Sequence, residues 1–221
     1  MVELYAAQAT KAYEMFYFDK VYPFLNTQRR NRIDSFLHVE DALRSLAGEW
    51  LTRLVLSEKL HLNFFEMLID YDKNGKPFYN SSSGIHFNIS HSGDWSVCAV
   101  STLQVGIDIE MVQPVDLSIA RDCFTENEFE TMTNFTDRND QLNYFYDIWT
   151  IKESYLKATG SGFCKAPDSF GTELNNHQIL LTGDVERGYS FRQYDFEYSY
   201  KICACSLETQ FSNNIKIRIP E

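Results

Sequence analysis

The pattern of apolar and polar residues predicts a mixture of helices and strands. The clearest helical pattern lies within residues 33–60, where apolar side chains recur at i, i+3, i+4, i+7 and i+11: Leu43, Leu46, Ala47, Trp50 and Leu54. Two more helices are predicted at residues 126–133 and 143–159, the second closed by Gly160-Ser161-Gly162. Short apolar runs typical of strands occupy residues 86–89, 97–101, 105–109, 190–196, 201–207 and 215–219.

Turn residues separate these runs. They occupy residues 74–77 (NGKP), 81–84 (SSSG) and 113–116 (QPVD). Because helices and antiparallel-type strands are mixed throughout the chain, we predict an α+β fold. A boundary near residues 101–104 would divide the sequence into an N-terminal half, 1–103, and a C-terminal half, 104–221.

Charge and cysteine content argue against several classes of protein: those that bind nucleic acid, membranes or zinc. The 221-residue chain carries a net charge of −11, which argues against binding to nucleic acid or to anionic membranes. Its five cysteines are scattered, without a CxxC pair or a zinc-binding pattern. No apolar run approaches the ~18 residues of a membrane span. We therefore expect a reduced, cytoplasmic protein with no membrane and no nucleic-acid partner.

The segment GIDIE at residues 106–110 is the most informative. In a strand, Asp108 and Glu110 share one face while Ile107 and Ile109 share the other. Two desolvated carboxylates repel each other, and a divalent cation such as Mg²⁺ would relieve that repulsion. The alternative is an edge strand with one solvated face, and the segment alone leaves both interpretations open.

The segment WTIKESYLK at residues 149–157 places charged residues among apolar ones on a predicted helix. Trp149, Lys152, Glu153 and Leu156 have the spacing of one helical face, and Lys157 follows Glu153 by one turn. A functional face is one interpretation, favoured by the aromatic and leucine neighbours. The other is an ordinary surface ion pair between Glu153 and Lys157.

Three further segments offer groups that bind anions. They are Ser90 and His91 after a strand, Lys76 and Pro77 in a stiff turn, and the basic cluster Arg29, Arg30 and Arg32, with Arg44 farther along the helix. In a chain this acidic, such a cluster fits a pocket for a small polyanion. The alternative for Ser90 and His91 is an ordinary Ser/Gly hairpin. The alternative for the arginines is a solvent-exposed segment that leads into a helix.

Thr125 and Glu128 have the spacing of a helix capping box, with Thr125 as N-cap and Glu128 three residues later. We therefore interpret Glu128 first as a structural residue.

Three of these motifs, in this order and spacing, closely resemble the surfactin-type 4′-phosphopantetheinyl transferases: FNISHS at residues 87–92, GIDIE at 106–110 and WTIKESYLK at 149–157. FLHVEDALR at 36–44, Gly75-Lys76-Pro77 and FTENE at 124–128 extend the resemblance. It covers the chain from about Arg29 to Phe163 and is looser on either side.

The resemblance implies two similar α+β halves related by a pseudo-twofold axis, with coenzyme A in the cleft between them. It implies transfer of the 4′-phosphopantetheine arm of coenzyme A to a serine of an apo acyl or peptidyl carrier protein, with release of 3′,5′-ADP. Mg²⁺ would be the cofactor, and non-ribosomal peptide or polyketide synthesis the process served. Since one chain would supply both halves, we expect a monomer.

The resemblance also implies a set of site residues. It assigns Asp108, Glu110 and Glu153 to Mg²⁺ and makes Glu153 the base for the carrier serine. Lys152 and Lys157 would neutralise the pyrophosphate during the reaction. The full set implied to contact coenzyme A is Arg29, Arg32, Arg44, Lys76, Pro77, Ser90, His91, Lys152 and Lys157. Glu128 aligns with an acidic residue that the family often places near the metal, so its role stays open.

Two other functions fit the same residues. A Mg²⁺-dependent pyrophosphohydrolase of coenzyme A or a nucleotide would use the same carboxylates with water as the acceptor. A non-catalytic coenzyme A-binding module would use the cationic groups and tolerate loss of Glu153.

Overall fold

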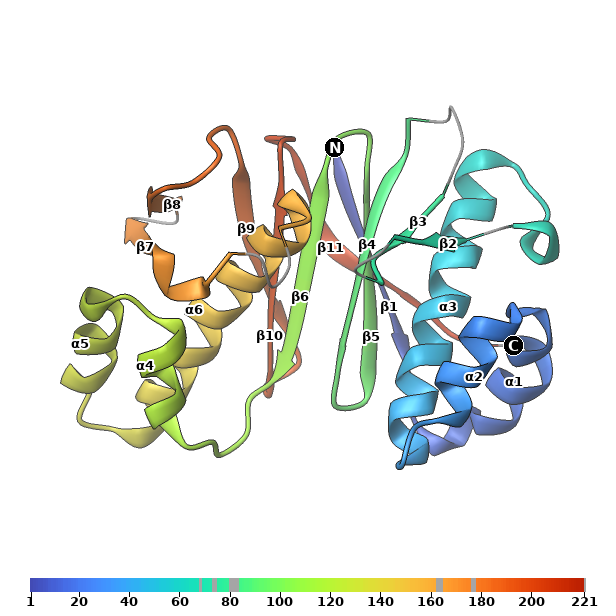
Figure 1. Cartoon of the computed structure of the whole chain (residues 1–221), viewed down its shortest axis with the longest axis horizontal. Coiled ribbons are helices and arrows are strands. Elements are labelled where there is room, and N and C mark those ends of the chain that lie inside the picture. Colours follow the sequence, from blue (N-terminus) through green and yellow to red (C-terminus); the bar gives the residue numbers. More distant parts are fainter. Residues whose placement is uncertain (68, 73–74, 80–83, 162–164, 176–177, 221) are drawn as a thin grey trace.

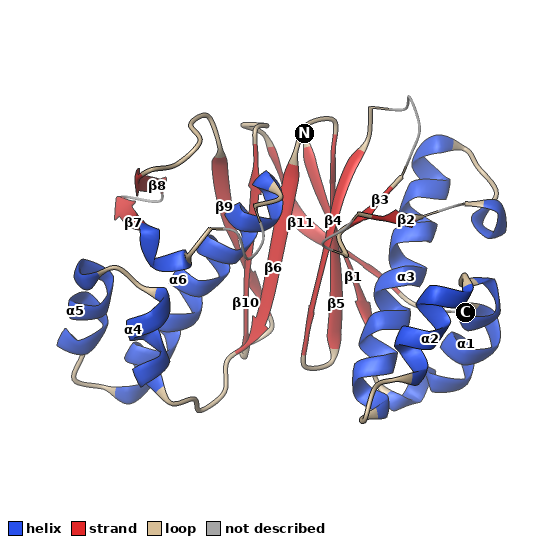
Figure 2. Cartoon of the chain, in the orientation of Figure 1, coloured by secondary structure: helices blue, strands red, loops and turns tan. Residues whose placement is uncertain are grey.

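The computed structural model describes residues 1–67, 69–72, 75–79, 84–161, 165–175 and 178–220. Parts of three predicted turns, at Asn74, at residues 81–83 and at Gly162, lie outside these residues. Strands occupy the middle of the molecule, and helices lie at both ends (Figures 1 and 2). Among the described residues, no helix is long and apolar enough to cross a bilayer.

The described part of the N-terminal half contains five strands and three α-helices. In chain order they are β1 (Val2–Gln8), α1 (Glu14–Lys20), α2 (Thr27–Asp34), α3 (Val39–Leu60), β2 (Asp70–Tyr71), β3 (Pro77–Phe78), β4 (His86–Ser92) and β5 (Trp95–Ser101). Short 3-10 helices accompany them: η1 (Lys11–Tyr13), η2 (Tyr22–Phe24) and η3 (Phe64–Glu66).

The C-terminal half begins with β6 (Val105–Met111) and continues with η4 (Leu117–Ile119), α4 (Ala120–Cys123), α5 (Glu126–Asn134), α6 (Arg138–Thr159) and η6 (Pro167–Ser169). Its later strands are β7 (Phe170–Asn175), β8 (Gln178–Gly183), β9 (Ser190–Phe196), β10 (Tyr200–Ser206) and β11 (Phe211–Arg218).

The two halves repeat one topology. Each contributes a strand, a group of helices ending in a 22-residue helix, a short hairpin and two more strands. The strands pair in the order β1-β5-β4 in the first half and β6-β10-β9 in the second, all antiparallel. The predicted α+β class with two similar halves is therefore confirmed.

The last strand crosses from one half to the other. β11 pairs in parallel with β1, at the outer edge of the first sheet. The first sheet therefore contains a strand from beyond the expected division at residues 103 and 104, which stays a prediction.

Several elements differ from their predicted bounds. The helix expected over residues 33–60 is two helices, since the backbone of His38 is extended (φ −115°, ψ 132°) just before α3 begins. α6 starts five residues earlier than expected, where the side chain of Asp137 accepts bonds from the first backbone amides. β1 was not predicted, because most of its residues are buried and it lacks a two-residue alternation.

Strand β6 lies with one face in the core between the two sheets. Ile107 and Ile109 are fully buried there, among apolar residues of β1, β5, β9 and β10. Asp108 and Glu110 consequently point to the opposite face, toward α6, as the alternation predicted.

Gly106 allows α6 to lie directly against β6. A Cβ atom at this position would lie 2.0 Å from the carbonyl oxygen of Ser154 and 2.4 Å from the backbone nitrogen of Ala158. Because both atoms belong to the helix backbone, relief would require α6 to move away from the carboxylates of β6.

We predict that Gly106→Ala lowers the free energy of unfolding by about 2 kcal/mol or more, because the added methyl overpacks the interface between helix and strand. Gly48→Ala in α3 is the matched control. Its Cβ would meet a movable side-chain methyl of Ile89 at 3.2 Å, and we expect a change of less than about 1 kcal/mol. Urea unfolding curves of the two variants make the comparison, and equal losses would contradict it.

Candidate active site

Side chains rather than a backbone ladder join the two sheets where their edge strands β4 and β6 meet. The Asn88 Oδ1 atom accepts a hydrogen bond from the backbone N–H of Ile107 (2.9 Å), and the Ser92 Oγ atom accepts one from that of Met111 (3.0 Å). Because residue numbers rise together along both strands, the strands run parallel. We call this junction the seam; its polar side chains are Asn88, Ser90, Ser92, Asp108 and Glu110.

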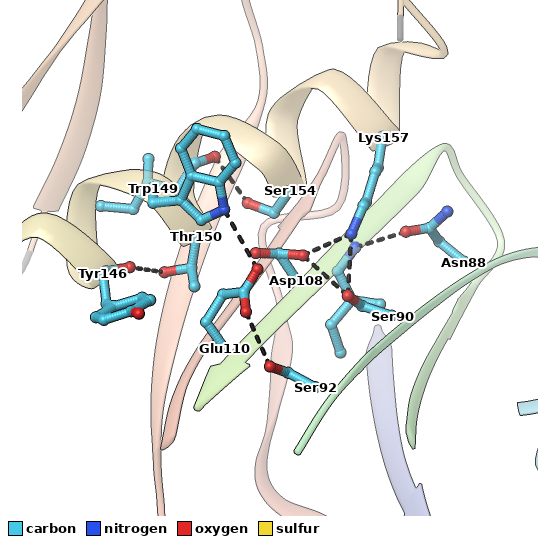
Figure 3. Close-up of polar contacts among 12 residues, drawn as sticks. Asn88, Ser90, Ser92, Asp108, Glu110, Tyr146, Trp149, Thr150, Ser154 and Lys157 are labelled. Atoms are coloured by element: carbon cyan, nitrogen blue, oxygen red, sulfur yellow. Dashed lines mark hydrogen bonds and ion pairs between the residues drawn. The ribbon is translucent and has the colours of Figure 1, made fainter. Parts of the chain in front are cut away.

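Asp108 lies at the centre of the seam and is only 2% exposed. Its Oδ1 atom accepts hydrogen bonds from the Ser90 hydroxyl (2.9 Å) and from the Lys157 ammonium (2.5 Å), which also donates to Ser90 (3.0 Å; Figure 3). Burial raises the pKa of Asp108, while the Lys157 charge opposes that rise. The Oδ2 atom is buried and has no hydrogen-bond partner among the residues that the structure describes.

Glu110 lies on the same face of β6 and is held at both oxygens. Ser92 donates to Oε2 (2.9 Å), and the indole N–H of Trp149 on α6 points to Oε1 (3.3 Å; Figure 3). Burial and the neighbouring charge of Asp108 raise the pKa of Glu110 to about 7. The two carboxylates are therefore buried close enough together for the charge of one to act on the other. This agrees with the prediction, from strand alternation, that they lie on one face.

Glu153 and Lys157 reach the same region from α6. Burial and the charge of Asp108 raise the pKa of Glu153, and Lys157 opposes the rise. The side chain of Lys157 is 28% exposed, whereas that of Asp108 is almost fully buried.

His91 lies next to the seam, close enough to Lys157 of α6 and to Arg44 and Arg29 of the N-terminal half for their charges to act on it. Desolvation and the charges of Lys157, Arg44 and Arg29 lower the pKa of His91 to about 4, although the residue as a whole is exposed. Its imidazole is therefore neutral at pH 7. The structure thus brings together, from separate elements, four of the residues expected to contact coenzyme A.

Arg29 and Arg44 already donate hydrogen bonds to other groups of the protein. Arg29 donates to Glu49 and to Ser45 on α3, both at 2.7 Å. Arg44 donates to the carbonyl oxygen of Gly93 (3.0 Å). Arg32, in contrast, is exposed on α2.

Lys76 links the short hairpin of the first half to the long helix of the second. Its ammonium donates to the backbone carbonyl of Lys157 (2.6 Å), and burial lowers its pKa. The next residue, Pro77, pairs with Tyr71 across the hairpin. The phenol of Tyr71 in turn donates to the Glu49 carboxylate.

Lys152 lies away from the seam. It is fully buried and pairs with Glu128 (2.8 Å) on the other side of α6. The expected contact of Lys152 with the pyrophosphate does not fit this placement, because a ligand in the seam cannot reach its ammonium. The capping box of Thr125 and Glu128 is confirmed.

Asn88, Ser92 and Glu49 were not expected among the site residues. A signal for the first two was present, since polar residues alternate with Phe87 and Ile89 along β4. For Glu49 there was none, because a single acidic residue in a long helix is normally solvated.

The carboxylates do not form a complete metal cage by themselves. Within the described residues, no three His, Cys, Asp or Glu side chains converge as a metal-binding group. The cation nearest to Asp108 is instead the Lys157 ammonium.

We predict that Glu110→Gln stabilises the metal-free protein at high pH. The folded-state pKa of Glu110, about 7, lies above the ordinary value of 4.5 for a glutamate. The folded state therefore binds this proton more tightly, and the wild-type free energy of unfolding falls as pH rises through that window. We expect the variant to gain about 2 kcal/mol over wild type between pH 4.5 and pH 8. Urea unfolding in EDTA measures this, and a pH-independent difference would contradict it.

Comparison with known proteins identifies the family. Residues 104–216 match the model of the 4′-phosphopantetheinyl transferase superfamily, and residues 14–103 match that of the 4′-phosphopantetheinyl transferase N-terminal region.

Curated relatives cover most of the chain. The 4′-phosphopantetheinyl transferase Sfp of Bacillus subtilis is 33% identical over 87% of this chain and 86% of its own length. The transferase ffp of Bacillus subtilis is 32% identical over 89% of this chain and 88% of its own length. The transferase gsp of Aneurinibacillus migulanus is 33% identical over 96% and 89%, respectively. The chain therefore belongs to the 4′-phosphopantetheinyl transferase superfamily and is a transferase of that class.

Proposed function

We propose that this transferase moves the 4′-phosphopantetheine arm of coenzyme A to a serine hydroxyl of an apo acyl or peptidyl carrier protein, releasing 3′,5′-ADP. The observation that carries the proposal is the seam. There the Lys157 ammonium donates to Asp108, and the charge of Asp108 acts on both Glu110 and Glu153. Arg29 and Arg44 add positive charge that acts on the neighbouring His91.

The chemistry requires a new bond from the serine oxygen to the phosphorus next to the pantetheine. The bond from that phosphorus to the bridging pyrophosphate oxygen breaks, and 3′,5′-ADP leaves. Glu153 suits the base that takes the serine proton, because its pKa is raised toward neutral pH. Lys157 supplies positive charge where the leaving group gains negative charge.

The groups around His91 suit the phosphates of coenzyme A. Arg44, Arg29 and the exposed Arg32 supply charge for the 3′-phosphate, with His91 as a further donor. Ser90 supplies a hydroxyl near the pyrophosphate, and Lys76 with Pro77 borders the adenine.

The carboxylates suit Mg²⁺. The Oδ2 atom of Asp108 is buried and unpaired within the described part of the chain, and burial raises the pKa of Glu110 to about 7, so a divalent cation would stabilise both carboxylates. Glu153 would be the third protein ligand. When bound, Mg²⁺ would supply charge that stabilises the pyrophosphate as it departs.

We further propose that the carriers belong to non-ribosomal peptide or polyketide synthesis, and that the protein acts as a monomer in the cytoplasm. In support, one chain supplies both strands of the seam and the helix above it.

Intact-protein mass spectrometry of an apo carrier domain tests the reaction. We expect a mass gain of one phosphopantetheine after incubation with this protein, coenzyme A and Mg²⁺, and no gain in EDTA. Coenzyme A cleaved without any gain by the carrier would instead indicate the hydrolase. Binding without either product would indicate the binding module.

We predict that Glu153→Gln lowers turnover by about a hundredfold or more, because the serine loses its proton acceptor. The Kd for coenzyme A should stay within about threefold, since no cationic group is lost. Glu130→Gln, on the exposed surface of α5, is the matched control and should leave both quantities unchanged. Wild-type turnover in Glu153→Gln would refute the assignment of the base.

A further inference from the structure

Lys152 and Glu128 form a buried ion pair behind the helix that carries Glu153. Their side chains are 0% and 1% exposed, and the ammonium lies 2.8 Å from Oε2 of Glu128. The rings of Phe124 and Phe170 flank the ammonium, with centroids 5.8 and 4.8 Å away. A buried charge is stable only when it is paired and hydrogen-bonded, so the other partners of both groups decide what the pair can do.

The Lys152 ammonium has no donor left for a ligand. An ammonium carries three N–H donors. They are matched by Glu128 (2.8 Å), the carbonyl oxygen of Pro167 (2.8 Å) and that of Phe170 (2.6 Å). All three acceptors are protein atoms, and burial lowers the pKa of Lys152.

The Glu128 carboxylate is equally saturated. Besides Lys152, its Oε2 atom accepts the backbone N–H of Thr125 (2.8 Å). Its Oε1 atom accepts the backbone N–H of Thr172 (2.7 Å) and the hydroxyl of the same residue (2.8 Å). Four donors satisfy the two oxygens, which leaves no lone pair directed to a metal.

These bonds tie three segments together. They connect the N-terminus of α5, the stretch from η6 into β7, and the turn of α6 on which Glu153 directly follows Lys152. Cys123 and Asp168, from the same flanking segments, lie close enough to Lys152 to favour its charged form.

We infer that Lys152 and Glu128 are positioning residues: together they form a clamp that fixes α5 and residues 167–172 against the α6 turn of Glu153, and neither contacts coenzyme A or the metal. The inference rests on the proposed function only in placing the substrate at the seam. It separates Lys152 from Lys157, five residues later, whose ammonium pairs with Asp108 and whose side chain is partly exposed.

A double-variant cycle tests the clamp. Lys152→Met leaves Glu128 charged and unpaired in the interior, so we expect the melting temperature to fall by roughly 10 °C. Glu128→Leu combined with Lys152→Met removes both charges, and should recover most of that loss. If Lys152→Met does not fold, Glu128→Gln replaces it, since this substitution keeps the shape while removing the charge.

Binding and turnover, measured well below the melting temperatures, separate positioning from ligand contact. Coenzyme A should bind the Lys152→Met and double variants within about threefold of wild type. Lys157→Met, the matched control, should weaken it about tenfold or more. We expect Lys152→Met to lower kcat with little change in KM for coenzyme A, and the double variant to regain part of kcat.

Two results would overturn the clamp. One is a loss of coenzyme A affinity in Lys152→Met that matches Lys157→Met and persists in the double variant. The other is a melting temperature of the double variant no higher than that of Lys152→Met. The thermal cycle needs no carrier protein, so failure of transfer would count against the proposed function and not against the clamp.

Discussion

Two carboxylates on neighbouring positions of a buried strand face repel each other and lose hydration. Asp108 and Glu110 meet both conditions, which is why the pKa of each is raised. The donors that offset this cost come from other elements: Ser90 and Ser92 from β4, and Lys157 with Trp149 from α6. The carboxylates therefore depend on the docking of the first sheet and of α6 against β6.

The seam has a structural consequence for the whole chain. Because β4 and β6 are joined by side chains, both halves must be folded and aligned before the site exists. A shift of β6 by one residue would turn Asp108 into the apolar core between the sheets and Ile107 toward α6. Gly106 reinforces this alignment, since it lets the helix backbone approach the strand closely.

Helix α6 directs three charged residues to two different places. Lys152 and Lys157 lie about 140° apart around the helix axis, because successive residues turn by about 100°. One ammonium consequently enters the interior beside Glu128 while the other reaches Asp108. Glu153 stays beside the carboxylates. The spacing within WTIKESYLK grouped Lys152 with Glu153, yet the protein uses them on separate surfaces.

Local patterns determined much of this protein. Alternation put Asp108 and Glu110 on one face of a strand, the spacing of Thr125 and Glu128 specified a helix cap, and the order of three motifs indicated the family. These features are short-range, so the chain itself encodes them. Only the tertiary structure decided that Lys157 rather than Lys152 meets Asp108, that β11 joins the first sheet, and that Asn88 and Ser92 bridge two strands. Those outcomes depend on which segments, far apart in the sequence, pack against each other and exclude water. The local pattern of residues does not specify that packing.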